Sequence, residues 1–278
     1  MADPLVSTEW LHEHLAAPDI RTVDATWFMP DAGRDARAEY EQAHIPGAVY
    51  FDIDEIADAD NPLPHMLPSA SKFASRVKRL GLGDGLRIVV YDNNSYAASA
   101  RVWWMFRTMG HEDVAVLDGG LGKWLAEGRP VDDLPTPPAE RHFTPRVNSF
   151  LLRDLDQMRT NLTGKREKVV DTRSAGRFTG TIAEPRPGLR AGHIPGAVNV
   201  PAGDLVAADG TLKDAQALTA VFAAAGVDLE SPITTSCGSG VSAAIANLAL
   251  ARLGRLDVAL YDGSWTEWGS QSDTPVAR

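Results

Sequence analysis

The sequence predicts an α/β protein made of two tandem copies of one unit, each with a parallel sheet covered by helices on both faces. The first observation is an internal repeat, because the segment His-Ile-Pro-Gly-Ala-Val at residues 44–49 returns at residues 193–198. Two further pairs of similar segments keep the same order and nearly the same spacing: 23–25 with 170–172, and 117–120 with 261–264. The second observation is that strand-like and helix-like patterns alternate within each copy, which is typical of parallel sheets.

The elements of the first copy follow from its apolar patterns. The β-branched run at residues 87–91 and the apolar residues at 113–117 predict two strands. The stretch between them, residues 96–109, is typical of a helix and ends at Gly110. The second copy has the same pattern, with strands predicted at residues 168–171, 232–236 and 257–261 and helices at residues 214–225 and 241–253.

Several polar residues lie where predicted strands end. They are Asp24, Asp92, Asp171 and Cys237. Open α/β sheets bind their ligands at the carboxyl ends of the strands. The sequence therefore places its candidate chemistry at this edge of each sheet.

A proline-rich segment separates the two copies. Five prolines fall between residues 129 and 149, and proline removes backbone donors and favours an extended chain. We therefore predict an N-terminal domain at residues 1–128, a linker at 129–149 and a C-terminal domain at 150–278.

The composition argues against several classes of function. With 27 basic and 37 acidic side chains, the chain has a formal net charge of −10. This charge argues against nucleic acid or an anionic membrane as the main partner. No apolar run approaches the roughly 18 residues of a membrane helix, and the first residues lack the pattern of a signal peptide. We therefore expect a cytoplasmic protein that binds neither nucleic acid nor membranes.

The chain contains a single cysteine, Cys237. One cysteine excludes an internal disulfide and any metal or iron–sulfur site that needs several cysteines. The sequence shows no other cluster of metal ligands, so we expect no metal and no cofactor. Cys237 is then either an inert buried thiol or a reactive one.

Cys237 follows a predicted buried strand and begins a loop that leads into a helix of small residues. Gly238 and Gly240 let successive backbone N–H groups converge on one centre, and the helix adds the positive end of its dipole. Such surroundings favour the thiolate, which is the nucleophilic form of cysteine. We expect the loop to cradle a persulfide on Cys237 through Gly238, Ser239, Gly240, Val241 and Ser242.

Two chemistries use a cysteine in this setting. A cysteine phosphatase needs an arginine after five intervening residues to bind the phosphoryl group, and the residue at that position is Ala243. The loop offers room for one additional atom more naturally than for a phosphate. We therefore favour sulfur transfer, in which the thiolate takes up a sulfane sulfur and the loop amides stabilise the persulfide.

These motifs resemble the two-domain rhodanese family. The resemblance rests on the two His-Ile-Pro-Gly-Ala-Val segments, on residues 237–243, and on Tyr-Asp-Gly-Ser-Trp-Thr-Glu-Trp at 261–268. It implies two tandem rhodanese-like domains, with the catalytic cysteine only in the second. The Cys-Gly-Ser-Gly-Val loop is similar to that of 3-mercaptopyruvate sulfurtransferases, whereas members that prefer thiosulfate usually carry Cys-Arg-Lys-Gly. Ser242 stands where threonine is usual, and both residues offer a hydroxyl.

The resemblance also implies which residues handle the substrate. By the family pattern, Arg177 in Gly-Arg-Phe and Arg186 in Glu-Pro-Arg bind the carboxylate of a keto acid, and a bidentate guanidinium suits this role. Asp54 and His65 match an aspartate and a histidine that are proposed to join the loop serine, here Ser239, in a relay. Such a relay would protonate the enolate that forms when sulfur leaves.

The expected function is that of a 3-mercaptopyruvate sulfurtransferase. The Cys237 thiolate would take the sulfur of 3-mercaptopyruvate, release pyruvate, and pass the sulfur to cyanide, a small thiol or thioredoxin. Two alternatives stay open: thiosulfate is the true donor, or the protein is a non-enzymatic carrier that holds a persulfide without turnover. Because the chain has no second cysteine, we expect an external acceptor to collect the sulfur.

The duplication also separates structural residues from chemical ones. His44 and His193 occur in both copies, so we assign them to folding. Asp92 stands where the second copy has Cys237, so the first copy has lost the nucleophile. The two tryptophans of the segment 261–268 are expected to pack in the core.

Overall fold

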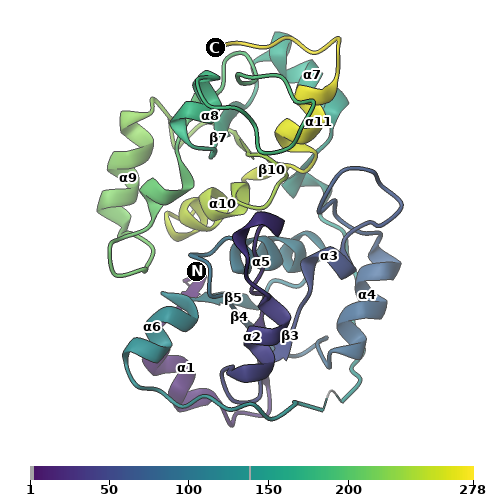
Figure 1. Cartoon of the computed structure of the whole chain (residues 1–278), viewed down its shortest axis with the longest axis vertical. Helices are drawn as coiled ribbons and strands as arrows, with labels where there is room; N and C mark the ends of the chain where they lie inside the picture. The colour runs from purple at the N-terminus through teal and green to yellow at the C-terminus, as the bar shows by residue number, and fades with distance from the viewer. Residues whose placement is uncertain (1–2, 138) are drawn as a thin grey trace. The chain divides into compact units, whose positions relative to one another are not determined.

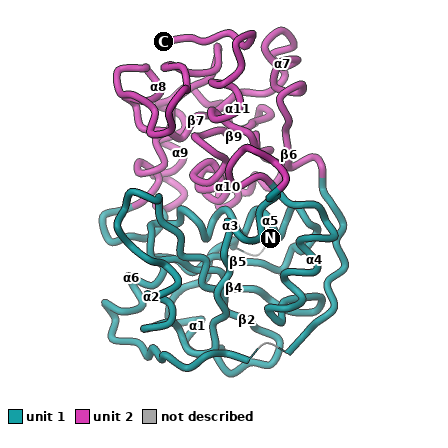
Figure 2. The backbone as a smooth tube through the Cα atoms, turned by 45° about the vertical axis from the view of Figure 1, so that its right-hand side comes forward, with its two compact units in different colours: residues 1–59, 67–148, 207–212 teal, residues 60–66, 149–206, 213–278 magenta. Residues whose placement is uncertain are grey.

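The computed structural model describes residues 3–137 and 139–278. The chain forms two compact units, which Figure 2 shows in teal and magenta. Unit 1 comprises residues 1–59, 67–148 and 207–212, and unit 2 comprises residues 60–66, 149–206 and 213–278. Each unit therefore includes one short segment that the sequence repeat would assign to the other.

Unit 1 contains a five-stranded parallel sheet in the order β1-β5-β4-β2-β3. Its strands are β1 (Leu5–Val6), β2 (Ile20–Asp24), β3 (Val49–Tyr50), β4 (Arg87–Tyr91) and β5 (Val114–Leu117). Its helices are α1 (Thr8–His14), α2 (Ala36–Gln42), α3 (Ile53–Ile56), α4 (Ala70–Arg79), α5 (Ser99–Thr108) and α6 (Gly120–Ala126), with a 3-10 turn η1 (Pro30–Ala32) (Figure 1). The central strand β4 is buried from Ile88 onward because helices cover the sheet.

Unit 2 repeats this topology in the order β6-β10-β9-β7-β8, again with every pair parallel. Its strands are β6 (Leu152–Arg153), β7 (Lys168–Asp171), β8 (Val198–Asn199), β9 (Ile233–Ser236) and β10 (Ala259–Tyr261). Its helices are α7 (Leu155–Gly164), α8 (Ala175–Thr179), α9 (Ala215–Ala224), α10 (Ala243–Arg252) and α11 (Ser264–Ser270), with 3-10 turns η2 (Ser149–Leu151) and η3 (Ala202–Leu205). The predicted α/β fold with two duplicated parallel sheets is confirmed.

Two helices begin later than the sequence pattern suggests. The pattern predicts helices from residues 96 and 241, but α5 begins at Ser99 and α10 at Ala243. In unit 1, Ser95 and Tyr96 adopt left-handed backbone conformations with φ of 51° and 67°, which cannot continue a helix. The strand-to-helix loops are therefore longer than propensity alone predicts, and both candidate polar residues, Asp92 and Cys237, begin such a loop.

The two repeated histidines make structural contacts. His44 Nδ1 lies 2.7 Å from the carbonyl oxygen of Tyr40, and His193 Nδ1 lies 2.9 Å from that of Phe178. Each ring also stacks on the same partner side chain, with ring centroids 4.2 and 3.7 Å apart. In addition, each histidine forms an antiparallel backbone bridge with a later segment, His44 with Asp132 and His193 with Ala277. These contacts support the assignment of both histidines to folding.

The proline-rich segment is anchored along unit 1. The backbone N–H of Arg146 donates to the carbonyl oxygen of Met109 at 2.8 Å, and that of Asn148 to Thr108 at 2.8 Å. Earlier in the segment, the backbone N–H of Asp84 donates to the carbonyl oxygen of residue 142 at 2.8 Å. Unit 1 accordingly extends to residue 148. The division into domains at 128 and 149 stays a prediction.

Candidate active site

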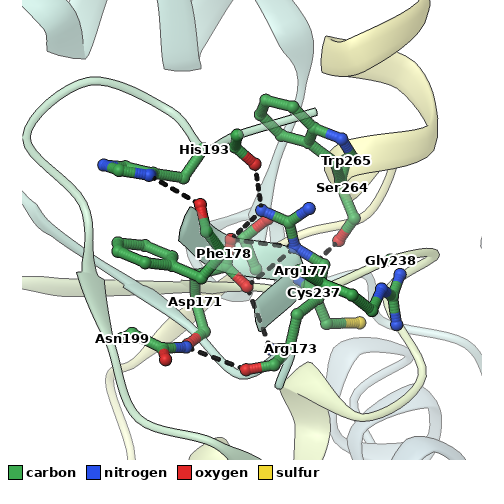
Figure 3. A network of polar contacts seen from close by, with 12 residues as sticks. Asp171, Arg173, Arg177, Phe178, His193, Asn199, Cys237, Gly238, Ser264 and Trp265 are labelled. Carbon is green, nitrogen blue, oxygen red and sulfur yellow. Dashed lines mark hydrogen bonds and ion pairs between the residues drawn. The ribbon is translucent and has the colours of Figure 1, made fainter. Parts of the chain in front are cut away.

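Cys237 lies directly after the carboxyl end of β9, with its side chain buried and its thiol free. Its backbone is fixed on both sides by the first two residues of α11. The backbone N–H of Cys237 donates to Ser264 Oγ at 3.1 Å, and its carbonyl oxygen accepts from the N–H of Trp265 at 3.0 Å (Figure 3). The position of the nucleophile therefore depends on a segment far from it in sequence.

Ser264 is a site residue that the sequence analysis did not identify. Its φ of 50° lies in the left-handed region, which serine rarely adopts. The buried hydroxyl donates to the carbonyl oxygen of Tyr261 at 2.8 Å while it accepts from Cys237. The repeat held a usable signal, since Gly120 occupies the equivalent place in unit 1 with a φ of 55°. In unit 2 a strained serine therefore replaces the glycine, and its hydroxyl accepts the hydrogen bond from the backbone N–H of Cys237.

Unit 1 shows what the strand–loop–helix turn of this fold does with negative charge. Asp92, the residue matched to Cys237, is buried, and its carboxylate accepts four backbone hydrogen bonds. The donors are the N–H groups of Asn94, Tyr96, Ala98 and Ser99, at 3.0, 3.1, 3.0 and 2.7 Å. A carboxylate held in this way is an anion bound in a cradle of amides. The residues of unit 2 that match these donors in the repeat are Ser239, Val241, Ala243 and Ala244.

The two glycines of the cysteine loop serve different needs. Gly240 has a φ of 76°, a conformation that residues with a side chain rarely adopt, so it permits the curl of the loop. Gly238 instead permits a close approach, because a Cβ atom there would lie 2.9 Å from Nη2 of Arg177. The sequence predicts that both glycines permit loop curvature, whereas only Gly240 has a positive φ in the structure.

Arg177 brings positive charge to the cysteine loop. It belongs to α8, which follows β7, and Figure 3 shows its guanidinium beside Gly238. Its Nη2 forms an ion pair with the buried carboxylate of Glu184 at 2.6 Å, and its side chain keeps 24% of its surface exposed. Arg177 therefore lies against the cysteine loop, and its role in binding substrate stays a prediction.

Arg173 has a structural role. Its side chain is fully buried and pairs with Asp171 at 2.7 Å and with Glu184 at 2.8 Å. It also donates to the carbonyl oxygen of Gly192 at 2.8 Å and lies 4.4 Å from the centre of the Trp265 ring. Both tryptophans of α11 are buried in the core, as expected. The strand end of β7 is thereby locked to the segment that carries Glu184.

The remaining loop residues lie close to buried groups of the same unit. Ser242 shares a hydrogen bond of 3.2 Å between its hydroxyl and that of Thr172 at the end of β7. Ser239 is 7% exposed and lies two residues from Cys237 on the loop. The hydrogen bond between Ser242 and Thr172 fixes the end of the loop against the residue that follows β7, and the cradle of residues 238–242 stays a prediction.

The other predicted site residues are distributed over both units. His65 is buried, has a left-handed backbone with φ of 61°, and lies in the segment 60–66 that belongs to unit 2 with Cys237 and Ser239. Asp54 belongs to unit 1, where it accepts a hydrogen bond of 2.8 Å from Trp27 Nε1. Arg186 lies half-buried between α8 and β8. Their joint action with Cys237 is a proposal.

Comparison with known proteins agrees with this geometry. The model of the rhodanese-like domain matches twice, at residues 7–127 and 154–271. The chain is 42% identical to human 3-mercaptopyruvate sulfurtransferase over 95% of its length and 91% of the relative, and 43% identical to mouse thiosulfate sulfurtransferase over the same shares. Among solved structures, SseA from Escherichia coli, described as a 3-mercaptopyruvate sulfotransferase, matches with a TM-score of 0.87 and 38% identity, covering 95% of this chain and 99% of that one. Tum1 from Saccharomyces cerevisiae matches with a TM-score of 0.90 and 31% identity, covering 99% and 97%. With two matched domains and relatives of this similarity over nearly its full length, the chain belongs to the rhodanese-like family and is a two-domain sulfurtransferase.

Proposed function

We propose that the chain transfers the sulfur of 3-mercaptopyruvate to a thiol or cyanide through a persulfide on Cys237. Overall identity does not choose the donor, because relatives named for 3-mercaptopyruvate and for thiosulfate match almost equally well. The observation that carries the choice is the approach of Arg177 to Gly238. A guanidinium beside the nucleophile suits a donor that carries a carboxylate.

Gly238 makes this arrangement possible. Any side chain at residue 238 begins with a Cβ atom, and that atom would lie 2.9 Å from Arg177 Nη2. Members of the family that prefer thiosulfate usually carry arginine at this position. An arginine at residue 238 would bring a second cation to the loop and displace the guanidinium of Arg177. The loop of this chain therefore favours recognition of the donor by Arg177 over recognition by the loop's own side chains.

The proposed reaction is balanced without an oxidant. The Cys237 thiolate attacks the sulfur of the donor, the new S–S bond forms, and the C–S bond breaks with its electron pair passing to the enolate of pyruvate. The proton of the donor's thiol ends on the methyl carbon of pyruvate. Cys237 then carries a persulfide anion. The acceptor then attacks the outer sulfur and restores the thiolate.

Support for the persulfide cradle comes from unit 1. There, the equivalent loop already holds one negative group, the carboxylate of Asp92, with four backbone N–H donors. A persulfide anion on Cys237 would place negative charge at the matched position of unit 2. Amides fixed before the reaction stabilise such charge without reorganisation.

Proton transfer to the enolate is assigned to Ser239, His65 and Asp54. Ser239 lies on the cysteine loop, and His65 is a buried histidine of the same unit. Asp54, a residue of α3, is the third member of this proposed relay. Replacing His65 by Gln should lower kcat with mercaptopyruvate more than with thiosulfate, because thiosulfate releases sulfite and forms no enolate.

Arg186 is proposed as the second group that binds the donor's carboxylate. Arg186→Ala should raise KM for mercaptopyruvate far more than KM for thiosulfate. Equal losses with both donors would argue against binding of the carboxylate by this residue. Thermal unfolding of the variant provides the check that the loop between α8 and β8 tolerates the change.

The decisive experiment compares initial rates with the two donors and cyanide as acceptor. A clear advantage for mercaptopyruvate is expected, and no advantage would overturn the choice of donor in favour of thiosulfate. Mass spectrometry should show Cys237 one sulfur atom heavier after the donor is added, and restored after a thiol is added. A label that no acceptor removes would instead indicate a persulfide carrier.

The sulfur acceptor and the location in the cell are further parts of the proposal. Since the chain has one cysteine, an external acceptor should collect the sulfur. The resemblance to the family implies a small thiol or thioredoxin as the acceptor in the cell, and cyanide would serve in vitro. Helices in the described part of the chain are too short or too polar to cross a membrane. One matched relative from Arabidopsis thaliana is named as mitochondrial, so cell fractionation is the test of the cytoplasmic location.

A further inference from the structure

We propose that Glu184 is a positioning residue, which holds the guanidinium of Arg177 with one edge turned toward the substrate's carboxylate. The inference rests on the proposed function, because it assumes a donor with a carboxylate. Glu184 is a buried acid that forms ion pairs with Arg173 and Arg177. Its importance follows from the bonds that it accepts.

Glu184 occupies one edge of the Arg177 guanidinium. Its carboxylate accepts from Nη2 at 2.6 Å and from Nε at 3.3 Å. A planar guanidinium has a second edge, formed by Nη1 and the other proton of Nη2, which can engage another carboxylate in the same bidentate way. Within the residues that the structure describes, Nη1 of Arg177 has no hydrogen-bond partner, and the side chain is partly exposed. Arg177 is thus held from one side and open on the other.

Glu184 is itself held rigidly. Its side chain is 2% exposed, and the fully buried Arg173 donates to it at 2.8 Å. Arg173 is in turn fixed by Asp171 and by the Trp265 ring. An arginine side chain loses much rotamer freedom when it is fixed. Here that freedom is lost on folding, before the donor arrives, which favours binding by preorganisation.

The four side chains Asp171, Arg173, Arg177 and Glu184 carry two negative and two positive charges, so Glu184 also neutralises Arg177. Neutralisation and positioning predict opposite results when the negative charge is removed. If Glu184 only weakens the field of Arg177, its loss should tighten binding of every anionic donor. If Glu184 positions Arg177, its loss should weaken binding of the carboxylate donor.

The test uses Glu184→Gln and Glu184→Asp, with kcat and KM measured for mercaptopyruvate and for thiosulfate. The Gln variant removes the charge, and the Asp variant keeps the charge but withdraws it by one methylene. For both variants we expect KM for mercaptopyruvate to rise about tenfold, the loss of roughly one charge-assisted hydrogen bond. KM for thiosulfate and kcat with either donor should change by less than about twofold.

Glu167→Gln is the matched control. Glu167 pairs with Arg153 at 2.6 Å in the same unit but precedes β7, at the opposite end of that strand from Asp171. It should lower the unfolding temperature without changing KM for either donor. If Glu184→Gln lowers KM for both donors, or raises both equally, the positioning role is wrong. A wild type that shows no preference for mercaptopyruvate would instead count against the proposed function.

A measurement on the wild type covers the case in which the variants do not fold. Side-chain ¹⁵N NMR, assigned with Arg177→Lys, should show slow rotation of the Arg177 guanidinium in the free enzyme. Addition of pyruvate should perturb this signal without further slowing it. A guanidinium that rotates freely until pyruvate binds would overturn the inference.

Discussion

Gly238→Ala tests the site most directly, because the change is one methyl group and its neighbour is known. The added Cβ atom would lie 2.9 Å from Arg177 Nη2, closer than real Cβ contacts. Gly238 does not have a positive φ, so alanine adds no backbone strain. The contact can be relieved only if Arg177 or the loop moves, and Nη2 is held by Glu184 at 2.6 Å.

The expected magnitude follows from what Arg177 would lose. A hydrogen bond to a charged group contributes about 1.5–3 kcal/mol, and about 1.4 kcal/mol corresponds to a factor of ten. If the displaced guanidinium loses one such bond to the donor's carboxylate, KM for mercaptopyruvate should rise roughly 10- to 100-fold. Thiosulfate has no carboxylate, so its KM should change much less.

The assay is steady-state kinetics with both donors and cyanide, together with thermal unfolding. Gly203→Ala is the matched control, because a Cβ atom at Gly203 meets nothing within 4 Å. It makes the same change in the same unit and should leave both KM values unaltered. A Gly238→Ala enzyme that keeps the wild-type KM for mercaptopyruvate would refute the argument that Arg177 must lie against this glycine.

Three further predictions concern other parts of the structure. Asp92→Ala should lower the free energy of unfolding by about 3 kcal/mol or more in a urea titration, because four N–H groups lose their acceptor; a change below about 1 kcal/mol would contradict the cradle. Ser264→Ala leaves the buried N–H of Cys237 without its acceptor, so kcat should fall with both donors while their ratio stays constant; a changed ratio would indicate a role in donor choice. Burial raises the pKa of Asp24 from 3.8 to about 6, so the folded state retains a proton that the unfolded chain releases. That stabilisation is complete below pH 4 and is lost as the pH rises through 6, amounting to at most about 3 kcal/mol. Asp24→Asn should remove this part of the pH dependence of unfolding, and identical pH profiles for the variant and the wild type would exclude the raised pKa.

The sequence alone determined the duplicated α/β fold, the strand ends and the cysteine loop. These features are local or repeated: the predicted strands at 87–91 and 168–171 match β4 and β7 residue for residue. Comparison of the two copies also separates residue roles, because His44 and His193 occur in both copies whereas Cys237 occurs in one. Periodicity and duplication are properties of the order of residues, so the sequence alone is enough to detect them.

Only the tertiary structure decided how the site is held. Glu184 and Ser264 are ordinary residues in the sequence, yet they fix Arg177 and the backbone of Cys237. The start of α10 also escaped prediction, because helix propensity describes neighbours in sequence and not the loop geometry that strand β9 and its partners impose. Hydrogen bonds and ion pairs between distant segments depend on where the folded backbone brings them, to within a few tenths of an ångström. The position of the folded backbone, and not residue type, therefore determines whether Arg177 faces the cysteine loop or solvent.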